Sequence, residues 1–366
     1  MMLDDEYDDR IEALLGEIEG LKRDILKKQV KDRSFNKVVE EETSVLEIRK
    51  NATKACRTLK GHFGKVYALQ WSSDSNNIVS ASQGGQLILW NAYSTNKLNA
   101  IALKTSWVMS CSIDQHKGNF VACGGLDNMC SIYRISNGSS NEQAQDPQSQ
   151  LVSELVAHDG YISCCRFIGD KNIVSASGDS SCIYWDLQRG EILNTFYDHG
   201  GDVMFISLHP TDPNIFVTGS IDHTAKLWDI RSGKSTQTHF GHEGDVNSVA
   251  FFPDGRAFAT GSEDSTCRIF DIRSYGEVKR FGGGTGITAP ITTVDFSRSG
   301  RLLFAGSVDN QAYGYDVMQS NTSTATQPIL NFSAGGHEKR ITCLQVSPKG
   351  DGMCTGSWDA TLKIWA

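Results

Sequence analysis

The sequence has 366 residues, a net charge of −8 at pH 7 and an isoelectric point near 5.6. Hydrophobic residues make up 39% of the chain and charged residues 21%, which is the ordinary balance of a globular protein. The acidic balance argues against nucleic acid or an anionic membrane surface as the main partner, since both attract basic proteins.

The chain begins with an acidic segment, MMLDDEYDDR, and not with a basic and apolar secretion signal. No apolar run approaches the length of about 20 residues needed to cross a bilayer. The ten cysteines are scattered and form no CxxC pair, so a zinc site is not expected. These features predict a cytosolic protein with reduced thiols and no bound metal.

Residues 4–31 carry apolar side chains at alternating steps of three and four residues, which is the pattern of a coiled-coil helix. An isolated helix of this kind would expose a row of apolar side chains to water, so the row needs a partner. Packing against the rest of the chain is one solution, and pairing with a helix of a separate chain is the one we favour. The apolar seam consists of Ile11, Leu14, Ile18, Leu21 and Ile25. We assign residues 1–50 to this helical segment.

A repeat with a period of about 42 residues fills the remainder of the chain. Its landmark is a small residue followed by His, and an aromatic residue follows some 28 positions later. The landmark histidines are His62, His158, His199, His242 and His337. Two of the intervals between them are twice as long as the others, and each holds a further unit without His, at 106–133 and 290–315. Seven units result.

Each unit reads as three short strands separated by turns, as in VNSVAFFPDGRAFATGSEDSTCRIFDI, and an Asp recurs in the second turn. This pattern resembles the WD repeat of β-propellers. The resemblance implies an all-β, seven-bladed propeller over residues 51–366, with a flexible polar insert near 136–150. The resemblance also implies four strands in each blade, and the last unit ends on its third, so we expect residues 55–60 to pair with its open edge and close the ring.

The same resemblance assigns a role to the five landmark histidines. In WD repeats the His, a strand Ser or Thr, the turn Asp and the Trp form one buried chain of hydrogen bonds. We therefore expect the five histidines to be structural, and a catalytic or metal-binding role is the alternative.

Aligning the units on their His brings three sets of residues to one mouth of the central channel, at the third and fifth positions after the His and just before the turn Asp. The prominent members are Lys65, Tyr67, Trp107, Met109, Leu126, Tyr161, Asp202, Met204, Asp245, Asn247, Glu263 and Trp358. Aromatic residues and Met among charges are typical of a protein-binding hot spot. The alternative is that these side chains only fill the channel. We favour a partner surface, because Trp107 and Met109 stand where the other units mostly carry smaller or charged residues.

Several segments in order resemble the β subunit of heterotrimeric G proteins, among them VACGGLDN, GYISCCRF, AKLWD and TGSWDATLKIW. The resemblance implies a non-catalytic signal transducer without a cofactor. Its N-terminal helix would pair with a prenylated γ subunit through the seam. Its mouth residues would bind the GDP-bound α subunit and, once that subunit is released, downstream effectors in receptor-driven signalling. It would lie in the cytoplasm, at the inner face of the plasma membrane, through its lipidated partners.

A second contact, to the N-terminal helix of the α subunit, would use Phe63, Ile88 and Lys97. The sequence departs from the family pattern near these residues, since Gly84 replaces the first turn Asp and Phe63 replaces a usual Leu. Glu263 also stands where Asp is usual. The 136–150 loop is longer than in the common animal members, and together with the segment TQPILNFSAGG before His337 it suggests a fungal or other divergent member.

The sequence leaves two other functions to consider. A WD-repeat scaffold or adaptor of another complex, assembled through the N-terminal helix, is the main alternative. An enzyme is disfavoured, because the GTGITA segment at 284–289 lacks the strand and helix that surround a dinucleotide-binding loop. The chain also has no GxxxxGK phosphate loop, so nucleotide would be bound by the partner.

Overall fold

The computed structural model describes residues 54–135, 151–283, 289–318, 327–333 and 335–366. The chain divides into two compact units, Met1–Asn51 and Ala52–Ala366. The first unit, with the predicted coiled-coil helix and its apolar seam, lies outside the described residues, and so does the 136–150 insert. The fold described below is that of the second unit.

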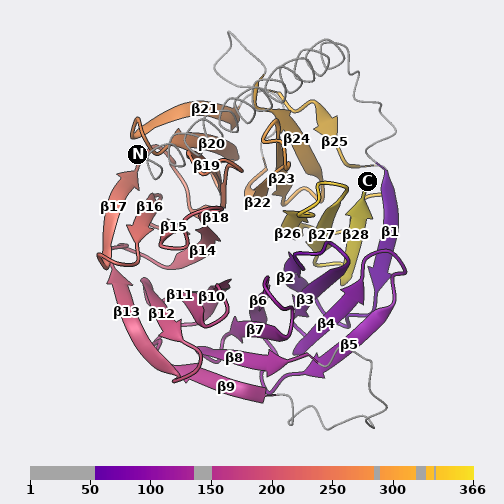
Figure 1. The fold of residues 1–366 in the computed structure, drawn as a ribbon. Helices are drawn as coiled ribbons and strands as arrows, with labels where there is room; N and C mark the ends of the chain where they lie inside the picture. Colours follow the sequence, from indigo (N-terminus) through magenta and orange to yellow (C-terminus); the bar gives the residue numbers. More distant parts are fainter. Residues whose placement is uncertain (1–53, 136–150, 284–288, 319–326, 334) are drawn as a thin grey trace, which may run out of the picture. The chain divides into compact units, whose positions relative to one another are not determined.

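The described part of the second unit forms seven four-stranded antiparallel sheets. Figure 1 shows the sheets arranged as the blades of a ring, with the first strand of each blade innermost. Each innermost strand contacts the innermost strands of the two neighbouring blades, and the first meets the last. The predicted all-β, seven-bladed propeller is therefore confirmed.

The strands of each blade follow one another along the chain. Blade 1 contains β2 (Val66–Trp71), β3 (Asn77–Ser82), β4 (Gln86–Asn91) and β5 (Lys97–Ala102), and blade 2 contains β6 (Val108–Ile113), β7 (Phe120–Gly125), β8 (Met129–Arg134) and β9 (Leu151–Val156). Blade 3 contains β10 (Ile162–Ile168), β11 (Asn172–Ser177), β12 (Ser181–Asp186) and β13 (Glu191–Tyr197), and blade 4 contains β14 (Val203–Leu208), β15 (Ile215–Ser220), β16 (Ala225–Asp229) and β17 (Lys234–His239). Blade 5 contains β18 (Val246–Phe251), β19 (Ala257–Ser262), β20 (Thr266–Asp271) and β21 (Gly276–Gly282), and blade 6 contains β22 (Ile291–Phe296), β23 (Leu302–Ser307), β24 (Ala312–Asp316) and β25 (Leu330–Asn331). Blade 7 contains β26 (Ile341–Val346), β27 (Met353–Ser357) and β28 (Thr361–Trp365), and it is completed by β1 (Ala55–Lys60).

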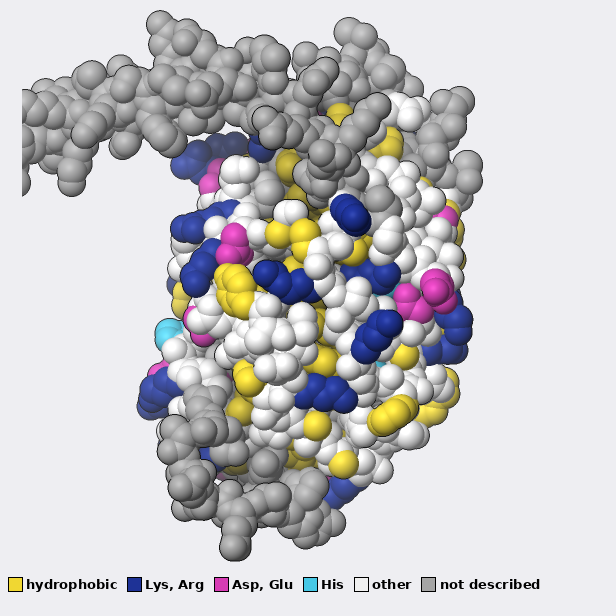
Figure 2. Space-filling view, turned by 90° about the vertical axis from the view of Figure 1, so that its right-hand side faces the viewer, with side chains coloured by type: hydrophobic (Ala, Val, Ile, Leu, Met, Phe, Trp, Pro, Cys, Tyr) yellow, Lys and Arg dark blue, Asp and Glu magenta, His cyan; other side chains and the backbone are white. Residues whose placement is uncertain are grey.

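The ring is closed by the pairing of β1 with β28, as predicted. The two strands are antiparallel, and Leu59 lies opposite Leu362. Leu59 is fully buried, so the closing strand contributes to the core as well as to the sheet. The side of the ring that carries β1 has Lys and Arg side chains spread across it, with Asp and Glu at fewer places (Figure 2).

The core lies between the blades, because each sheet packs both of its faces against its neighbours. The second strand of a blade is buried along almost its whole length, whereas in an outermost strand such as β9 exposed residues alternate with half-buried or buried ones. Gly261 in β19 shows how closely blades approach one another. A Cβ at this position would lie 2.7 Å from the Val294 side chain and 2.8 Å from the Ile291 side chain of the next blade. Only glycine fits there without moving a neighbour.

Candidate functional site at the channel mouth

One backbone hydrogen bond, repeated in all seven blades, builds the mouth of the channel. In each blade the N–H of the residue before the second turn donates to the carbonyl of the residue that precedes the innermost strand. In blade 2 the Leu126 N–H donates to the Trp107 carbonyl at 3.1 Å, and in blade 5 the Glu263 N–H donates to the Asp245 carbonyl at 2.9 Å. The bond holds the two aligned positions side by side at the same end of every innermost strand. The register predicted from the repeat therefore has a physical cause.

Three aromatic residues from three blades meet at this mouth. The Tyr67 ring lies with its centroid 6.2 Å from the Trp107 ring and 6.2 Å from the Trp358 ring. Trp107 is 39% exposed and Leu126, beside it, is 51% exposed. The blades thus bring together residues that lie far apart in the sequence, and they leave one large apolar side chain of the group, Trp107, accessible.

Two cations contact the Trp358 ring. The Lys65 Nζ lies 3.7 Å from the ring centroid, and the guanidinium carbon of Arg340 lies 3.2 Å from it. Cations at such distances are attracted to the electron-rich face of an indole. Arg340 was not among the predicted site residues, although it occupies the same aligned position as Lys65 and Trp107. This shared position in the alignment of the units was the sequence signal that would have identified Arg340.

Polar contacts position a second group of predicted residues on blades 3 and 4. The Tyr161 hydroxyl donates to Asp202 Oδ2 at 2.9 Å and lies 3.7 Å from the Met204 sulfur. Burial and the Asp202 carboxylate raise the pKa of Tyr161 well above its usual value, so the hydroxyl keeps its proton. On the next blade the Asp245 carboxylate lies 3.6 Å from His223 Nδ1.

The channel behind the mouth encloses about 500 Å³. Half of the predicted mouth residues line it, namely Tyr67, Met109, Met204, Asn247, Glu263 and Trp358. Deeper in the channel, Asp295 accepts hydrogen bonds from the backbone N–H groups of Phe296 at 2.9 Å and Val346 at 2.7 Å. Burial raises the pKa of Asp295 to about 7.

The fifth position after the landmark His has two kinds of occupant. At four blades its side chain donates to a backbone carbonyl of the next blade, as Thr342 does to Val66 at 2.6 Å and Thr292 does to Ile341 at 2.7 Å. Ser163 and Asn247 do the same. The other three occupants are Tyr67, Met109 and Met204. In the described part of the chain no hydrogen bond joins these three side chains to the following blade.

The second predicted contact, on the rim of blade 1, is only partly at the surface. Phe63 is 89% exposed, and the Lys97 side chain is also exposed, with its Nζ donating to the Gly61 carbonyl at 3.2 Å. Ile88 is 0% exposed and belongs to the core between blades 7 and 1. Its side chain therefore does not reach the surface on which Phe63 and Lys97 lie.

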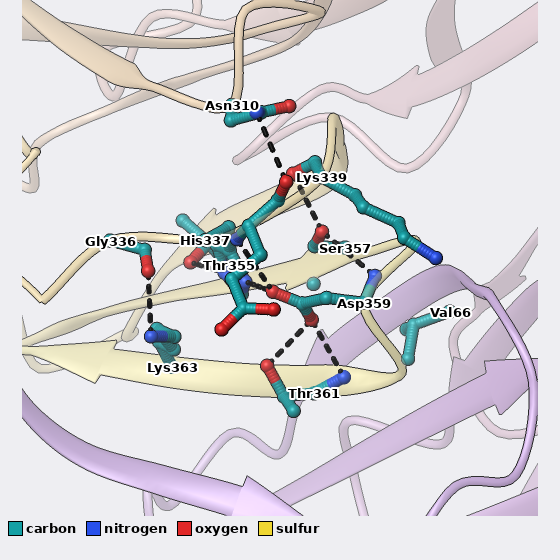
Figure 3. Close-up of polar contacts among 12 residues, drawn as sticks. Val66, Asn310, Gly336, His337, Lys339, Thr355, Ser357, Asp359, Thr361 and Lys363 are labelled. Atoms are coloured by element: carbon teal, nitrogen blue, oxygen red, sulfur yellow. Dashed lines mark hydrogen bonds and ion pairs between the residues drawn. The ribbon is translucent and has the colours of Figure 1, made fainter.

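Figure 3 shows the bonds around the landmark His of blade 7. His337 Nδ1 lies 2.8 Å from Asp359 Oδ2, and its Nε2 lies 2.8 Å from Thr355 Oγ1. The Trp365 indole N–H donates to the same Thr355 hydroxyl at 2.9 Å. Blades 3 and 4 have the same four-residue chain, and blade 5 has it without the Trp because Phe270 stands in that place.

Blade 1 has only part of this series of hydrogen bonds: the bonds among His, Ser and Trp are present, and the bond from His to Asp is missing. His62 Nε2 lies 2.7 Å from Ser80 Oγ, which also accepts the Trp90 indole N–H at 2.8 Å. Nδ1 of His62 is buried and has no hydrogen-bond partner among the described residues, because Gly84 stands in place of the turn Asp. Burial and the nearby Lys97 charge lower the pKa of His62 to about 4.

Within the described ranges, no group of three His, Cys, Asp or Glu side chains is placed to hold a metal ion. In the same part of the chain, no helix combines the length and the apolar character that a membrane span requires.

Comparison with known proteins gives concordant matches. The model of the G protein beta WD-40 repeat protein family matches residues 9–366. A guanine nucleotide-binding protein subunit beta from Dictyostelium discoideum is 49% identical over 313 residues, which cover 86% of this chain and 85% of the relative. A protein of the same description from Arabidopsis thaliana is 44% identical over 321 residues, which cover 85% of this chain and 83% of the relative.

Proposed function

The chain belongs to the family of G protein β WD-40 repeat proteins, and from this premise we propose that it is the non-catalytic β subunit of a heterotrimeric G protein. It pairs with a γ subunit through the N-terminal seam and binds the GDP-bound α subunit through the channel mouth. When the α subunit leaves, the same mouth binds effectors in receptor-driven signalling. The complex acts in the cytoplasm at the inner face of the plasma membrane, where its lipidated partners hold it.

The observation that carries this proposal is the aromatic group of Tyr67, Trp107 and Trp358 at one mouth of the ring, in which Trp107 is exposed and the other two are half-buried. Large aromatic side chains flanked by cations supply most of the binding energy in many protein interfaces. The group is held by sheets on all sides, so little conformational entropy is lost when a partner docks.

A rigid mouth also suggests how the switch works. If the α subunit and the effectors use the same residues, their binding is mutually exclusive, and this chain need not change shape. The nucleotide changes only the affinity of the α subunit, because a ligand shifts an equilibrium by its differential affinity for the two states.

The first test is a titration of the purified complex of this chain and a γ subunit with a G protein α subunit. The α subunit is loaded with GDP in one series and with a non-hydrolysable GTP analogue in the other. We expect tight binding to the GDP form only. Equal binding in both series, or none in either, would contradict the proposal and favour a WD-repeat scaffold of another complex.

The Trp107→Ala variant tests the assigned surface. We expect its binding to the GDP-loaded α subunit to weaken by about 2 kcal/mol or more, as for a central aromatic hot-spot residue. The folded state should be little affected, because Trp107 is already 39% exposed. A loss within about 0.5 kcal/mol would show that the binding surface lies elsewhere.

Pairing with the γ subunit is tested at the N-terminal seam. We expect Ile18→Asp to abolish the dimer, because the substitution places a charge in a coiled-coil core. Glu19→Gln, one residue away and off the seam, is the matched control. The measurement is the elution volume of the co-expressed pair on a sizing column, and an unaffected Ile18→Asp dimer would defeat the coiled-coil assignment.

A further inference from the structure

The innermost strands of the seven blades place a ring of side chains deep in the channel, at the fifth residue of each strand. All members of this ring except Ser112 line the channel, which encloses about 500 Å³. Spaces of about 300–1,000 Å³ are typical of small-molecule sites, so this level of the channel is large enough to hold a ligand. The seven members are Gln70, Ser112, Arg166, Ser207, Ala250, Asp295 and Gln345.

The neutral polar members of the ring hold the next blade in place. Gln70 Oε1 accepts a hydrogen bond from the Ile113 N–H of blade 2 at 2.7 Å. Gln345 and Ser207 make the equivalent bonds to blades 1 and 5, at 2.7 Å and 3.2 Å. A neutral acceptor is therefore sufficient to join two blades at this level. The two charged members of the ring are not needed for that purpose.

The charged members, Arg166 and Asp295, lie on opposite walls of the channel. They belong to blades 3 and 6, three blades apart in a ring of seven, and Figure 1 shows β10 and β22 on opposite sides of the channel. Both residues are half-buried, and neither forms an ion pair with another described residue. The Arg166 charge still reaches the carboxyl, since it opposes part of the rise that burial causes in the Asp295 pKa. Partly desolvated charges without a partner are costly, and a ligand between them would satisfy both.

Both groups keep hydrogen-bonding capacity for a ligand. Arg166 Nη1 donates to the Cys165 carbonyl at 2.8 Å and to the Cys111 carbonyl at 3.3 Å. The N–H groups on Nε and Nη2 donate to no described residue, so they are left for a ligand. The guanidinium carbon lies 5.0 Å from the centroid of the Phe205 ring, which supports the group from one side. Each oxygen of Asp295 accepts one backbone N–H and has a second lone pair free.

The two charges select the chemistry of the ligand. A free anion at Arg166 would be repelled by the Asp295 carboxylate, and a free cation at Asp295 would be repelled by the guanidinium. A metal ion is also disfavoured, because the described residues bring no group of three His, Cys, Asp or Glu side chains together around it. A molecule that carries one charge of each sign avoids both repulsions.

We propose that the channel binds a small zwitterion, whose carboxylate pairs with Arg166 and whose ammonium pairs with Asp295, with a short chain between them that crosses the channel. The planar guanidinium suits a carboxylate, which it can bind through two parallel hydrogen bonds. This inference goes beyond the proposed function, because neither residue belongs to the surface assigned to the α subunit.

The test measures binding of small probes to the purified full chain by ligand-observed NMR at pH 8, where a carboxyl with a pKa of about 7 is mostly ionised. The probes are γ-aminobutyrate, which carries both charges, and butyrate and butylamine, which have the same length and carry one charge each. We expect γ-aminobutyrate to bind at least about tenfold more tightly than either control, since each control lacks one charge-assisted contact. Equal affinities for the three probes, or no binding of γ-aminobutyrate, would overturn the proposal.

Glycine tests whether the ligand crosses the channel. Its two charges are too close together to reach opposite walls, so we expect it to bind at least about tenfold more weakly than γ-aminobutyrate. Equal binding of glycine would contradict a ligand that bridges Arg166 and Asp295. These measurements use the wild-type chain and do not depend on the folding of any variant.

Two neutral variants test the assigned ends of the ligand. Asp295→Asn keeps an acceptor for the Val346 N–H and removes the charge, so the preference for γ-aminobutyrate over butyrate should fall to within about twofold. Arg166→Gln should reduce the preference over butylamine in the same way. Ser112→Ala, at the same position of blade 2 but outside the channel lining, is the matched control and should keep both preferences. A general loss of folded protein would weaken all probes alike, so wild-type preferences in either charge variant would overturn the assignment.

Discussion

Blades 1 and 7 are neighbours in the ring, yet they use the same repeat positions in different ways. In blade 7 the landmark His337 is paired with Asp359, and Thr342 donates across the blade boundary to Val66. In blade 1 the landmark His62 lacks its acid, and Tyr67 stands where Thr342 stands in blade 7. The bonds that hold blade 7 in place are thus missing at two positions of blade 1.

The difference between the two blades indicates which positions of a repeat protein can carry functional residues. A single hydrogen bond contributes only about 1 kcal/mol to stability, so a ring with the other blades intact tolerates its loss in one blade. Positions freed in this way can carry side chains that a partner needs. Blade 1 accordingly presents Phe63, Lys65 and Tyr67 at its rim and mouth, whereas blade 7 presents Trp358 in an otherwise complete bonding pattern.

The largest difference between the two blades should appear in the stability of the protein at acid pH. Because folding lowers the pKa of His62 from 6.5 to about 4, the unfolded chain takes up a proton between these pH values and the folded chain does not. The stability contributed by the neutral ring is almost complete at pH 7.5 and is lost as the pH falls toward 4, by about 2.5 kcal/mol at pH 4.5.

Gly84→Asp makes blade 1 like blade 7 and is the variant that isolates this effect. A carboxylate beside His62 favours the charged ring, so the variant should lose much less stability in acid. The measurement is the free energy of unfolding in urea at pH 7.5 and pH 4.5 for both chains. An identical loss in the two chains would show that His62 is not the titrating group.

The next effect concerns binding. Tyr67→Thr gives blade 1 the residue of blade 7 and removes the ring that contacts both Trp107 and Trp358. We expect the affinity for the GDP-loaded α subunit to fall by about 2 kcal/mol, as for an aromatic residue at the centre of a hot spot. Stability should not fall, because Thr at this position can donate to the next blade. Unchanged affinity in the same titration would remove Tyr67 from the binding surface.

The smallest effect is the converse substitution in blade 7. Thr342→Val keeps the shape of the side chain and removes the hydrogen bond to the Val66 carbonyl. We expect the free energy of unfolding to fall by about 1 kcal/mol, with α-subunit binding unchanged. If binding fell as well, the distinction between bonding residues and partner-facing residues at this position would not hold.

The repeat register predicted most of the fold and the meeting of the mouth residues. The number of blades follows from the spacing of the repeat, and the closing strand at 55–60 follows from the four-stranded blade that the WD-repeat resemblance implies. The juxtaposition of Trp107 and Leu126 follows from the backbone bond that each blade repeats.

The rest depends on contacts that a single repeat does not contain. Ile88 is buried because both faces of β4 are covered by neighbouring blades, so alternation along the strand does not tell which side chains reach water. The position of Arg340 against Trp358 depends on how two long side chains pack at one mouth. The unpaired Nδ1 of His62 follows from Gly84, a departure visible in the sequence whose physical effect is seen only once the donors are in place.

The pairing of β1 with β28 has a consequence for how the ring is made. Ala55 pairs with Trp365, so the strand that closes blade 7 leaves the ribosome long before its partner does. Contacts between such distant segments slow folding, because the loop between them must be closed before they add stability. At synthesis rates of about 5–20 residues per second, β1 waits for tens of seconds with its edge unpaired. The ring can therefore be completed only after β28 has been made, so the last strand of the ring determines when it closes.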